Sequence, residues 1–184
     1  MREVLFTSFG PFRDIVHNPS ILVASMAAAA VCRAGGTATA LELPVTYAAV
    51  ASAAVTLGRE PLRLHVGVAA SRTLVTVEQW GKPESGEEPD NDGEVGPEVH
   101  PGLVALRSSS AERLLRALRD EGVEVALSED AGGFVCNAML WHSLRAGADA
   151  CFVHVPALTD EAAELLGLRL GRAVVRLLGG GSVG

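Results

Sequence analysis

Short runs of strand-forming residues alternate with longer helical patterns along this chain, and this alternation restricts the fold more than any other sequence feature. The clearest runs, rich in Val, Leu, Phe and Thr, lie at Glu3–Phe9, Thr37–Leu43, Leu62–Ala69 and Ala150–Val155. A further apolar run, Val123–Leu127, is typical of a buried strand. Strands that alternate with helices form a mainly parallel sheet with helices on both faces. The sequence therefore predicts an α/β fold with three layers, α/β/α, around a mainly parallel mixed sheet.

Capping and stop signals mark helices between these runs. Asn18-Pro19 is a typical helix start, because Asn can cap the first turn and Pro is accepted at its first position. Ser109 and Glu112 have the spacing of a capping box. The expected helices run from Pro19 to the Gly35-Gly36 pair, from Tyr47 to Leu57 before Gly58, from the Ser109 cap to Glu121, from Phe134 to Leu144, and from Thr159 or Asp160 to Leu178.

A long polar segment, Gly81–Gly102, follows a partly alternating strand pattern at Thr73–Trp80. Long irregular segments in compact domains are commonly functional surface loops, so we expect a lid or flap here. Within it, Asp90–Gly93 resembles the start of a calcium loop. No bidentate Glu follows at the required spacing, and we therefore expect a solvated turn rather than a metal site.

Charge and composition exclude several classes of protein. The formal net charge is −7 and the 15 Lys and Arg residues form no dense run, which argues against a nucleic-acid surface. No stretch has the length of a membrane span, and the N-terminus lacks a signal-peptide pattern. The three cysteines are widely spaced, which favours neither a disulfide framework nor a metal knuckle. We expect one cytoplasmic domain over residues 1–184, with a flexible tail at about 179–184, no metal or cofactor, and no membrane partner.

Cys136 is the strongest candidate nucleophile in the sequence. It follows the turn Ala131-Gly132-Gly133 and lies in the first turn of the helix expected at Phe134–Leu144. Free backbone N–H groups and the helix dipole at such a position favour a thiolate, and the same groups can stabilise an oxyanion. The alternative is that Cys136 is a buried core cysteine.

His154 and Glu78 are the residues that could act with Cys136. Sites in an open α/β sheet gather at the carboxyl ends of the strands, and His154 and Glu78 lie near the ends of two expected strands. A thiol, an imidazole and a carboxylate at one edge could serve as nucleophile, base and orienting acid. Two alternatives stay open: His154 as a core histidine, and Glu78 as a surface carboxylate paired with Arg72.

Four segments carry a family resemblance, in the same order along nearly the whole chain. They are FTSFGPF with the following Asn18-Pro19-Ser20, LHVGVAASRTLVTVE at Leu64–Glu78, AGGFVCN at Ala131–Asn137, and FVHVP at Phe152–Pro156. Together they resemble the pyroglutamyl peptidase I family of cytosolic cysteine peptidases. The resemblance implies a phosphorylase/hydrolase-like fold, hydrolysis of the amide bond after an N-terminal pyroglutamyl residue, and no cofactor.

The resemblance also implies a role for each candidate. Cys136 would be the nucleophile, His154 the general base, and Glu78 the carboxylate that orients His154. The implied partner is a peptide or small amide with a blocked N-terminus, and homodimer and homotetramer are both open as assemblies. A small apolar pocket for the pyrrolidone ring would be lined by Phe9, Phe12 and Phe134, with Val68 at a strand end beside it.

The segment after Glu78 departs from the family pattern. Pro89-Asp90-Asn91 is kept, but Glu87 and Glu88 stand where the resemblance implies an arginine near the oxyanion or substrate. This difference leaves two alternatives open. The chain could be a related cysteine amidohydrolase with a different acyl specificity, or a binding protein without catalysis.

Overall fold

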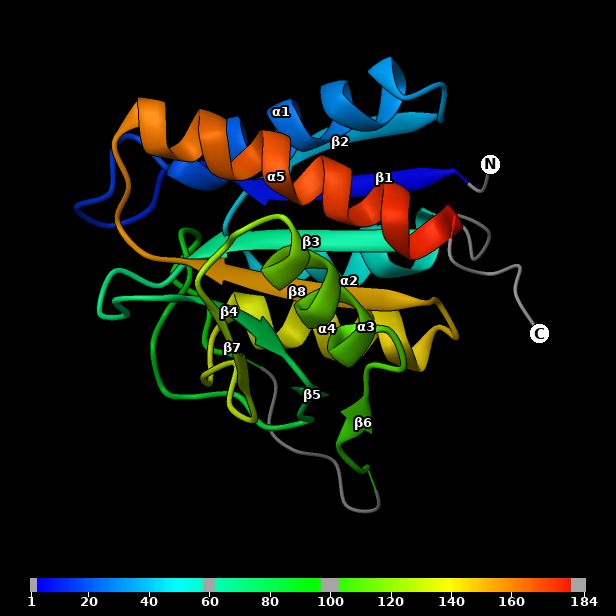
Figure 1. The fold of residues 1–184 in the computed structure, drawn as a ribbon. Helices are drawn as coiled ribbons and strands as arrows, with labels where there is room; N and C mark the ends of the chain where they lie inside the picture. Colours follow the sequence, from blue (N-terminus) through cyan, green and yellow to red (C-terminus); the bar gives the residue numbers. More distant parts are fainter. Residues whose placement is uncertain (1–2, 58–61, 97–102, 180–184) are drawn as a thin grey trace.

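The computed structural model describes residues 3–57, 62–96 and 103–179, in which strands and helices alternate as expected (Figure 1). The strands are β1 (Val4–Phe9), β2 (Ala38–Leu43), β3 (Leu62–Val68), β4 (Val75–Glu78), β5 (Trp80–Gly81), β6 (Leu106–Arg107), β7 (Val125–Ser128) and β8 (Ala150–Val155). The helices are α1 (Pro19–Arg33), α2 (Tyr47–Thr56), α3 (Ala111–Asp120), α4 (Val135–Arg145) and α5 (Asp160–Gly179).

Six strands form one mixed sheet in the order β2-β1-β3-β8-β4-β7, and β5 and β6 form a separate two-stranded sheet. Strands β2, β1, β3 and β8 are parallel. β4 is antiparallel to β8 and parallel to β7, so β4 and β7 run against the other four strands. The predicted α/β fold with a mainly parallel mixed sheet is confirmed. The premise that all strand carboxyl ends meet at one edge is wrong for β4 and β7.

Helices cover both faces of the sheet, and the side chains of β8 alternate between the two cores. Cys151, Val153 and Val155 pack in the core that includes α1, α3 and α5. Ala150 and Phe152 pack in the other core, with α2 and α4. Coverage of both faces explains why β3 and β8 are buried along their whole length and are mainly apolar, with Arg63, His65 and His154 as their buried polar side chains.

Helix ends follow the expected signals with one exception. The side chain of Asn18 caps α1 by accepting a hydrogen bond from a first-turn backbone N–H. The capping box expected at Ser109 is wrong, because Ser110 directly precedes α3 and makes no side-chain cap. Glu112 instead forms an ion pair with Arg107, which lies on β6. The carboxylate predicted to cap the helix thus pairs with a side chain five positions earlier in the sequence.

Two expected strands are shorter in the structure. The run at Thr73–Trp80 divides at Gln79, whose N–H donates to Ser128 and whose carbonyl accepts from Ser108, so the chain passes from the main sheet to β5. The run at 123–127 becomes β7, an edge strand that is only partly buried. Gly58, the tail beyond residue 179 and residues 97–102 of the expected lid lie outside the described residues.

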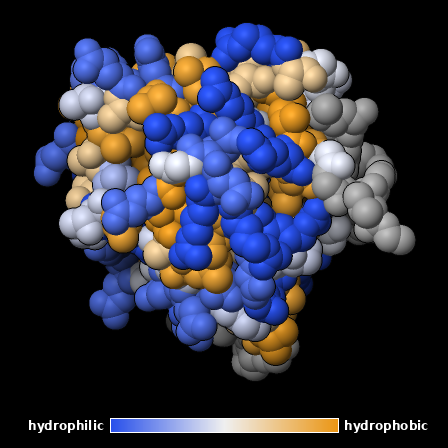
Figure 2. All heavy atoms as spheres, viewed as in Figure 1, coloured by the Kyte–Doolittle hydropathy of each residue, from blue (hydrophilic) through white to orange (hydrophobic). Residues whose placement is uncertain are grey.

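The face of the molecule in Figure 2 carries hydrophilic side chains across its centre, with hydrophobic residues in separate areas around them. None of the helices in the described part of the chain has an apolar stretch long enough to cross a bilayer.

Candidate active site

The pairing of β4 with β8 brings Glu78 to His154. In the antiparallel register Thr76 lies opposite His154 and Glu78 lies opposite Phe152, so the carboxylate and the imidazole are diagonal neighbours. Nδ1 of His154 lies 2.9 Å from Oε1 of Glu78. Glu78 is fully buried and His154 is 3% exposed. The two residues therefore form a desolvated hydrogen-bonded pair.

The protonation of this pair follows from its surroundings. Burial alone raises the pKa of Glu78, but interactions with His154, a hydrogen bond from Ser128 and the positive charge of Arg72 together outweigh it and hold that pKa below its usual value. An ionised carboxylate only accepts hydrogen bonds, so Nδ1 of His154 donates. Burial lowers the pKa of His154, against the raising effect of Glu78. The imidazole is thus neutral at neutral pH, with Nε2 left as a base.

Arg72 binds the same carboxylate. Its Nη1 donates to Oε1 of Glu78 at 2.6 Å and also bonds the hydroxyl of Thr76, and its Nη2 donates to the carbonyl of Asp130 at 2.8 Å. The pairing with Arg72 is therefore present, but the interpretation of Glu78 as a surface carboxylate is wrong. Arg72 links β4 to the loop that leads into α4.

Cys136 lies in the first turn of α4, as expected. Gly132 adopts φ 81° in the preceding turn, a conformation that glycine tolerates best. Phe134 is the N-cap and provides no side-chain cap, so the first-turn N–H groups of α4 have no side-chain acceptor at this cap. The turn and the helix start together present the thiol and backbone N–H groups at the same place.

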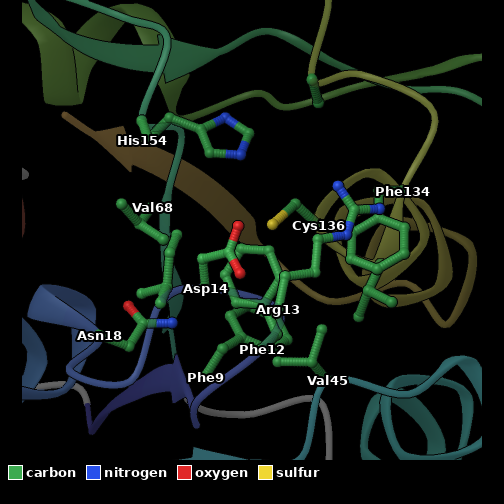
Figure 3. A pocket seen from close by; sticks show the side chains of 14 residues that line it. Phe9, Phe12, Arg13, Asp14, Asn18, Val45, Val68, Phe134, Cys136 and His154 are labelled. Atoms are coloured by element: carbon green, nitrogen blue, oxygen red, sulfur yellow. The ribbon is translucent and has the colours of Figure 1, made fainter. Parts of the chain in front are cut away.

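Gly67 makes room for the thiol beside His154. It is the register partner of His154 in the parallel pairing of β3 with β8. A Cβ built on Gly67 would lie 2.9 Å from Sγ of Cys136. The sulfur therefore rests on the backbone of β3 at the strand position next to His154. Figure 3 shows Cys136 and His154 lining the same cavity.

The pKa of the Cys136 thiol differs from expectation. Burial and then the negative charge of Glu78 raise it to about 12, and the positive charge of Arg72 only partly opposes them. The expectation of a thiolate, based on the helix N-terminus, is therefore wrong. Desolvation and the charge of Glu78 outweigh the charge of Arg72 and the backbone hydrogen bond at Cys136, and the resting thiol is protonated.

The cavity in front of Cys136 has a volume of about 420 Å³. Phe9, Phe12, Phe134 and Val68, the residues expected to bind substrate, all line it. Three of its lining side chains are phenylalanines, and the ring centroids of Phe12 and Phe134 are 6.2 Å apart. Tyr47 packs edge-on against the Phe134 ring from outside the lining, at a centroid distance of 5.9 Å. Sequence reasoning missed the other eight lining residues, among them Arg13, Asp14, Asn18 and Val45. The position of Arg13 and Asp14 directly after Phe12, in the turn that follows β1, could have indicated the first two.

The segment after β5 is attached to the start of α4. Oδ1 of Asn137 accepts from the N–H of Lys82 at 2.8 Å, and its Nδ2 donates to the carbonyls of Lys82 and Glu84. The N–H of Gly86 donates to the carbonyl of Gly133 at 2.6 Å. The described part of the expected lid therefore packs against the turn that precedes Cys136.

Asp90 builds a turn, as expected, but the turn is not solvated at Asp90, whose side chain is buried. Its Oδ1 accepts from the N–H groups of Asp92 and Glu94, and its Oδ2 accepts from the N–H of Tyr47 at the start of α2. The carboxylate of Asp90 thus connects its own turn to the N-terminus of α2. Among the described residues, no three His, Cys, Asp or Glu side chains are placed to hold a metal ion.

The other buried thiol and imidazole lie apart from this cavity. Cys151 faces the core with α1, α3 and α5, one register position away from Phe152, and its Sγ contacts the hydroxyl of Ser108 at 3.4 Å. His65 is fully buried, bonded to the hydroxyls of Thr7 and Ser143. Adjacent strand residues point to opposite faces, so Cys151 cannot reach the cavity that His154 lines.

Comparison with known proteins adds independent information. The family model described as pyroglutamyl peptidase matches residues 2–169. The chain is 36% identical to a pyrrolidone-carboxylate peptidase of Streptomyces coelicolor over 179 residues, covering 88% of this chain and 81% of that protein. It is 32% identical to one from Escherichia fergusonii over 176 residues, covering 89% and 82%. The crystal structure of pyrrolidone carboxyl peptidase from Thermus thermophilus matches with a TM-score of 0.72 at 26% identity, over 92% of this chain and 99% of that one.

Proposed function

Because the chain belongs to the pyroglutamyl peptidase family, whose members are cysteine-type hydrolases, we propose that it hydrolyses the amide bond after an N-terminal pyroglutamyl residue. The observation that carries this proposal is that Cys136 and His154 line one cavity, with the buried carboxylate of Glu78 hydrogen-bonded to His154. Cys136 is the nucleophile, His154 the general base, and Glu78 the group that orients the imidazole.

The first half of the reaction forms an acyl-enzyme. Nε2 of His154 removes the thiol proton as Sγ of Cys136 attacks the pyroglutamyl carbonyl carbon, and a C–S bond forms. The carbonyl oxygen becomes an oxyanion, which the first-turn N–H groups of α4 are placed to stabilise. The imidazolium then gives its proton to the leaving nitrogen, the C–N bond breaks, and a thioester remains.

The second half returns the enzyme to its resting state. His154 removes a proton from water, the resulting oxygen attacks the thioester carbon, and the C–S bond breaks. The proton held by His154 returns to the departing sulfur, so Cys136 is again a thiol. Glu78 stays ionised throughout and stabilises the transient imidazolium. A base adjacent to the sulfur is required because the resting thiol is protonated.

The cavity suits the acyl group of this substrate. A pyrrolidone ring is small, flat and neutral, with one N–H and one carbonyl to satisfy. Ligand sites of this kind combine apolar walls with a few polar groups. Phe9, Phe12 and Phe134 provide the walls, and the side chain of Asn18 reaches the same cavity with its Nδ2 bound to the carbonyl of Gly10.

A pyroglutamyl-arylamide assay tests the proposal. Wild-type protein should release the arylamine, and Cys136→Ala should reduce the rate to that of the buffer while the thermal unfolding temperature stays close to wild type. Cys151→Ala is the matched control, since it removes a buried thiol that lies on the other face of the sheet. It should keep wild-type turnover.

Further measurements separate the mechanism from the substrate. Glu78→Gln should lower kcat by about a hundredfold or more, because it removes the charge that stabilises the imidazolium. Equal turnover by the wild-type and Cys136→Ala proteins would refute the mechanism. A protein that cleaves other acyl-arylamides but leaves the pyroglutamyl one intact would refute the substrate assignment.

A further inference from the structure

The rim of the cavity carries a cation held in an unusual backbone conformation. Arg13 lines the cavity and has φ 49°, the only described non-glycine residue with positive φ. Such a conformation disfavours a residue with a Cβ, and it persists only where surrounding contacts hold it. Backbone hydrogen bonds between Phe12 and Ile15, at 3.1 and 2.9 Å, close the turn around Arg13.

Two side-chain contacts fix the position of the guanidinium. Its carbon lies 5.0 Å from the centre of the Phe134 ring, so Arg13 covers part of a ring that lines the acyl cavity. Its Nη2 donates to Oε2 of Glu88 at 2.6 Å. Figure 3 shows Arg13 beside Phe134, on the side of the cavity that also carries Cys136.

The Arg13–Glu88 pair joins two segments that are far apart in the sequence. Arg13 follows β1, whereas Glu88 lies in the segment after β5. A second bond between the same segments, from Nδ2 of Asn91 to the carbonyl of Pro11 at 2.9 Å, fixes their separation. The carboxylate of Glu88 is therefore held where it neutralises the one cation among the cavity-lining residues described by the structure.

We propose that the Arg13–Glu88 pair is a specificity device that makes the cavity select a neutral acyl group over an anionic one. The inference rests on the proposed function, because it assumes that the acyl group binds against Phe134. With Glu88 in place, its negative charge compensates the positive charge of Arg13 at the rim, and a carboxylate on the acyl group gains little binding affinity. Without Glu88, the positive charge of Arg13 is opposed among the described cavity-lining residues only by the carboxylate of Asp14, and it attracts a carboxylate on the acyl group more strongly.

Ligand binding to the Cys136→Ala protein tests this inference without turnover. The probes are pyroglutamide, which has the neutral lactam, and glutaramate, which has an open acyl chain that ends in a carboxylate. Calorimetry gives the affinity for each. Glu88→Gln should raise the affinity for glutaramate relative to pyroglutamide by about three- to fivefold at low salt, the range of an exposed charge pair, and less at high salt.

Glu87→Gln is the matched control. It removes the same charge from the neighbouring exposed residue, for which no ion pair is found within the described part of the chain. It should change the ratio by less than about 1.5-fold. The double variant Arg13→Gln, Glu88→Gln should return the ratio to that of the parent, because the cation is gone.

Three results would overturn the inference. Glu87→Gln and Glu88→Gln could change the affinity ratio equally, the double variant could keep the raised relative affinity for glutaramate, or pyroglutamide could fail to bind. Failure of the thiol-containing enzyme to cleave a pyroglutamyl-arylamide would overturn the proposed function instead, since the binding ratios are measured in a protein without the thiol.

Discussion

Gly67→Ala is expected to impair catalysis by moving the thiol of Cys136. The added Cβ would lie 2.9 Å from Sγ, whereas ordinary contacts of a Cβ begin at 3.4 Å. The sulfur must therefore retreat by about 0.5 Å or more. Misplacement of a reacting group by about 1 Å can cost about a hundredfold in rate, so we expect kcat/KM to fall by about ten- to a hundredfold.

The same substitution also affects stability. The new Cβ would lie 2.8 Å from Cζ of Phe152, whose ring is fully buried. Overpacking of this kind costs about 1–3 kcal/mol, which corresponds to a decrease in Tm of about 3–9 °C for a chain of this size. Activity must therefore be measured well below the transition, so that the loss reports the geometry of the folded site.

Val66→Ala is the matched control for Gly67→Ala. Val66 lies on the same strand and is fully buried, but it packs in the core on the opposite face of the sheet. Its truncation should lower Tm by a similar amount while kcat/KM with a pyroglutamyl-arylamide stays near wild type. Wild-type kcat/KM in Gly67→Ala would refute the reasoning. Equal activity losses in both variants would show that stability, not the position of the thiol, is responsible.

Three further predictions follow from the buried polar groups. The rate at which iodoacetamide alkylates Cys136 should keep rising to at least about pH 9.5, because burial raises the thiol pKa to about 12. The measurement uses a Cys32→Ser background, since Cys32 is exposed, and a plateau below pH 7 would contradict the prediction. Burial, with the charge of Arg63, lowers the pKa of His65 from 6.5 to about 3, so the native state rejects a proton that the unfolded state binds. The contribution of His65 to the free energy of unfolding is complete above about pH 6.5 and decreases as the pH falls, by about 3 kcal/mol at pH 4. Urea unfolding of His65→Gln should therefore depend less on acid pH than that of the wild type, and identical pH profiles would argue against the prediction. Asn137→Ala removes three hydrogen bonds to the segment after β5. It should lower the free energy of unfolding by about 2–4 kcal/mol and raise KM for the arylamide. An unchanged urea midpoint would show that these hydrogen bonds do not contribute to stability.

Local pattern was sufficient for most of the fold. The expected runs at β1, β3 and β8 and the helix starting at Pro19 are present, because burial on both faces and capping chemistry leave clear signals in a few adjacent residues. The run at β2 is also present, although that edge strand is mostly exposed. The capping box was predicted wrongly, although every residue involved is close in the sequence. Glu112 was expected to complete a capping box, but its carboxylate pairs with Arg107 on another element.

The residue types Cys, His and Glu near the ends of expected strands also indicated the candidate site, but the expected strand direction was partly incorrect. Cys136, His154 and Glu78 were expected together at strand carboxyl ends, yet β4 runs against β8. Glu78 reaches His154 by cross-strand pairing in an antiparallel register, which depends on strand order and direction. Neither property can be deduced from the residues of β4 alone.

By itself, the sequence determined the alternation of elements, the position of Cys136 in the first turn of a helix, and the aromatic residues of the cavity. Only the tertiary structure decided the direction of β4, the compensation of Arg13 by Glu88, and the protonation of the thiol. The physical reason is the range of the interactions. Periodicity and capping act between residues a few positions apart, whereas desolvation and charge pairing depend on every segment that folding brings to the same place.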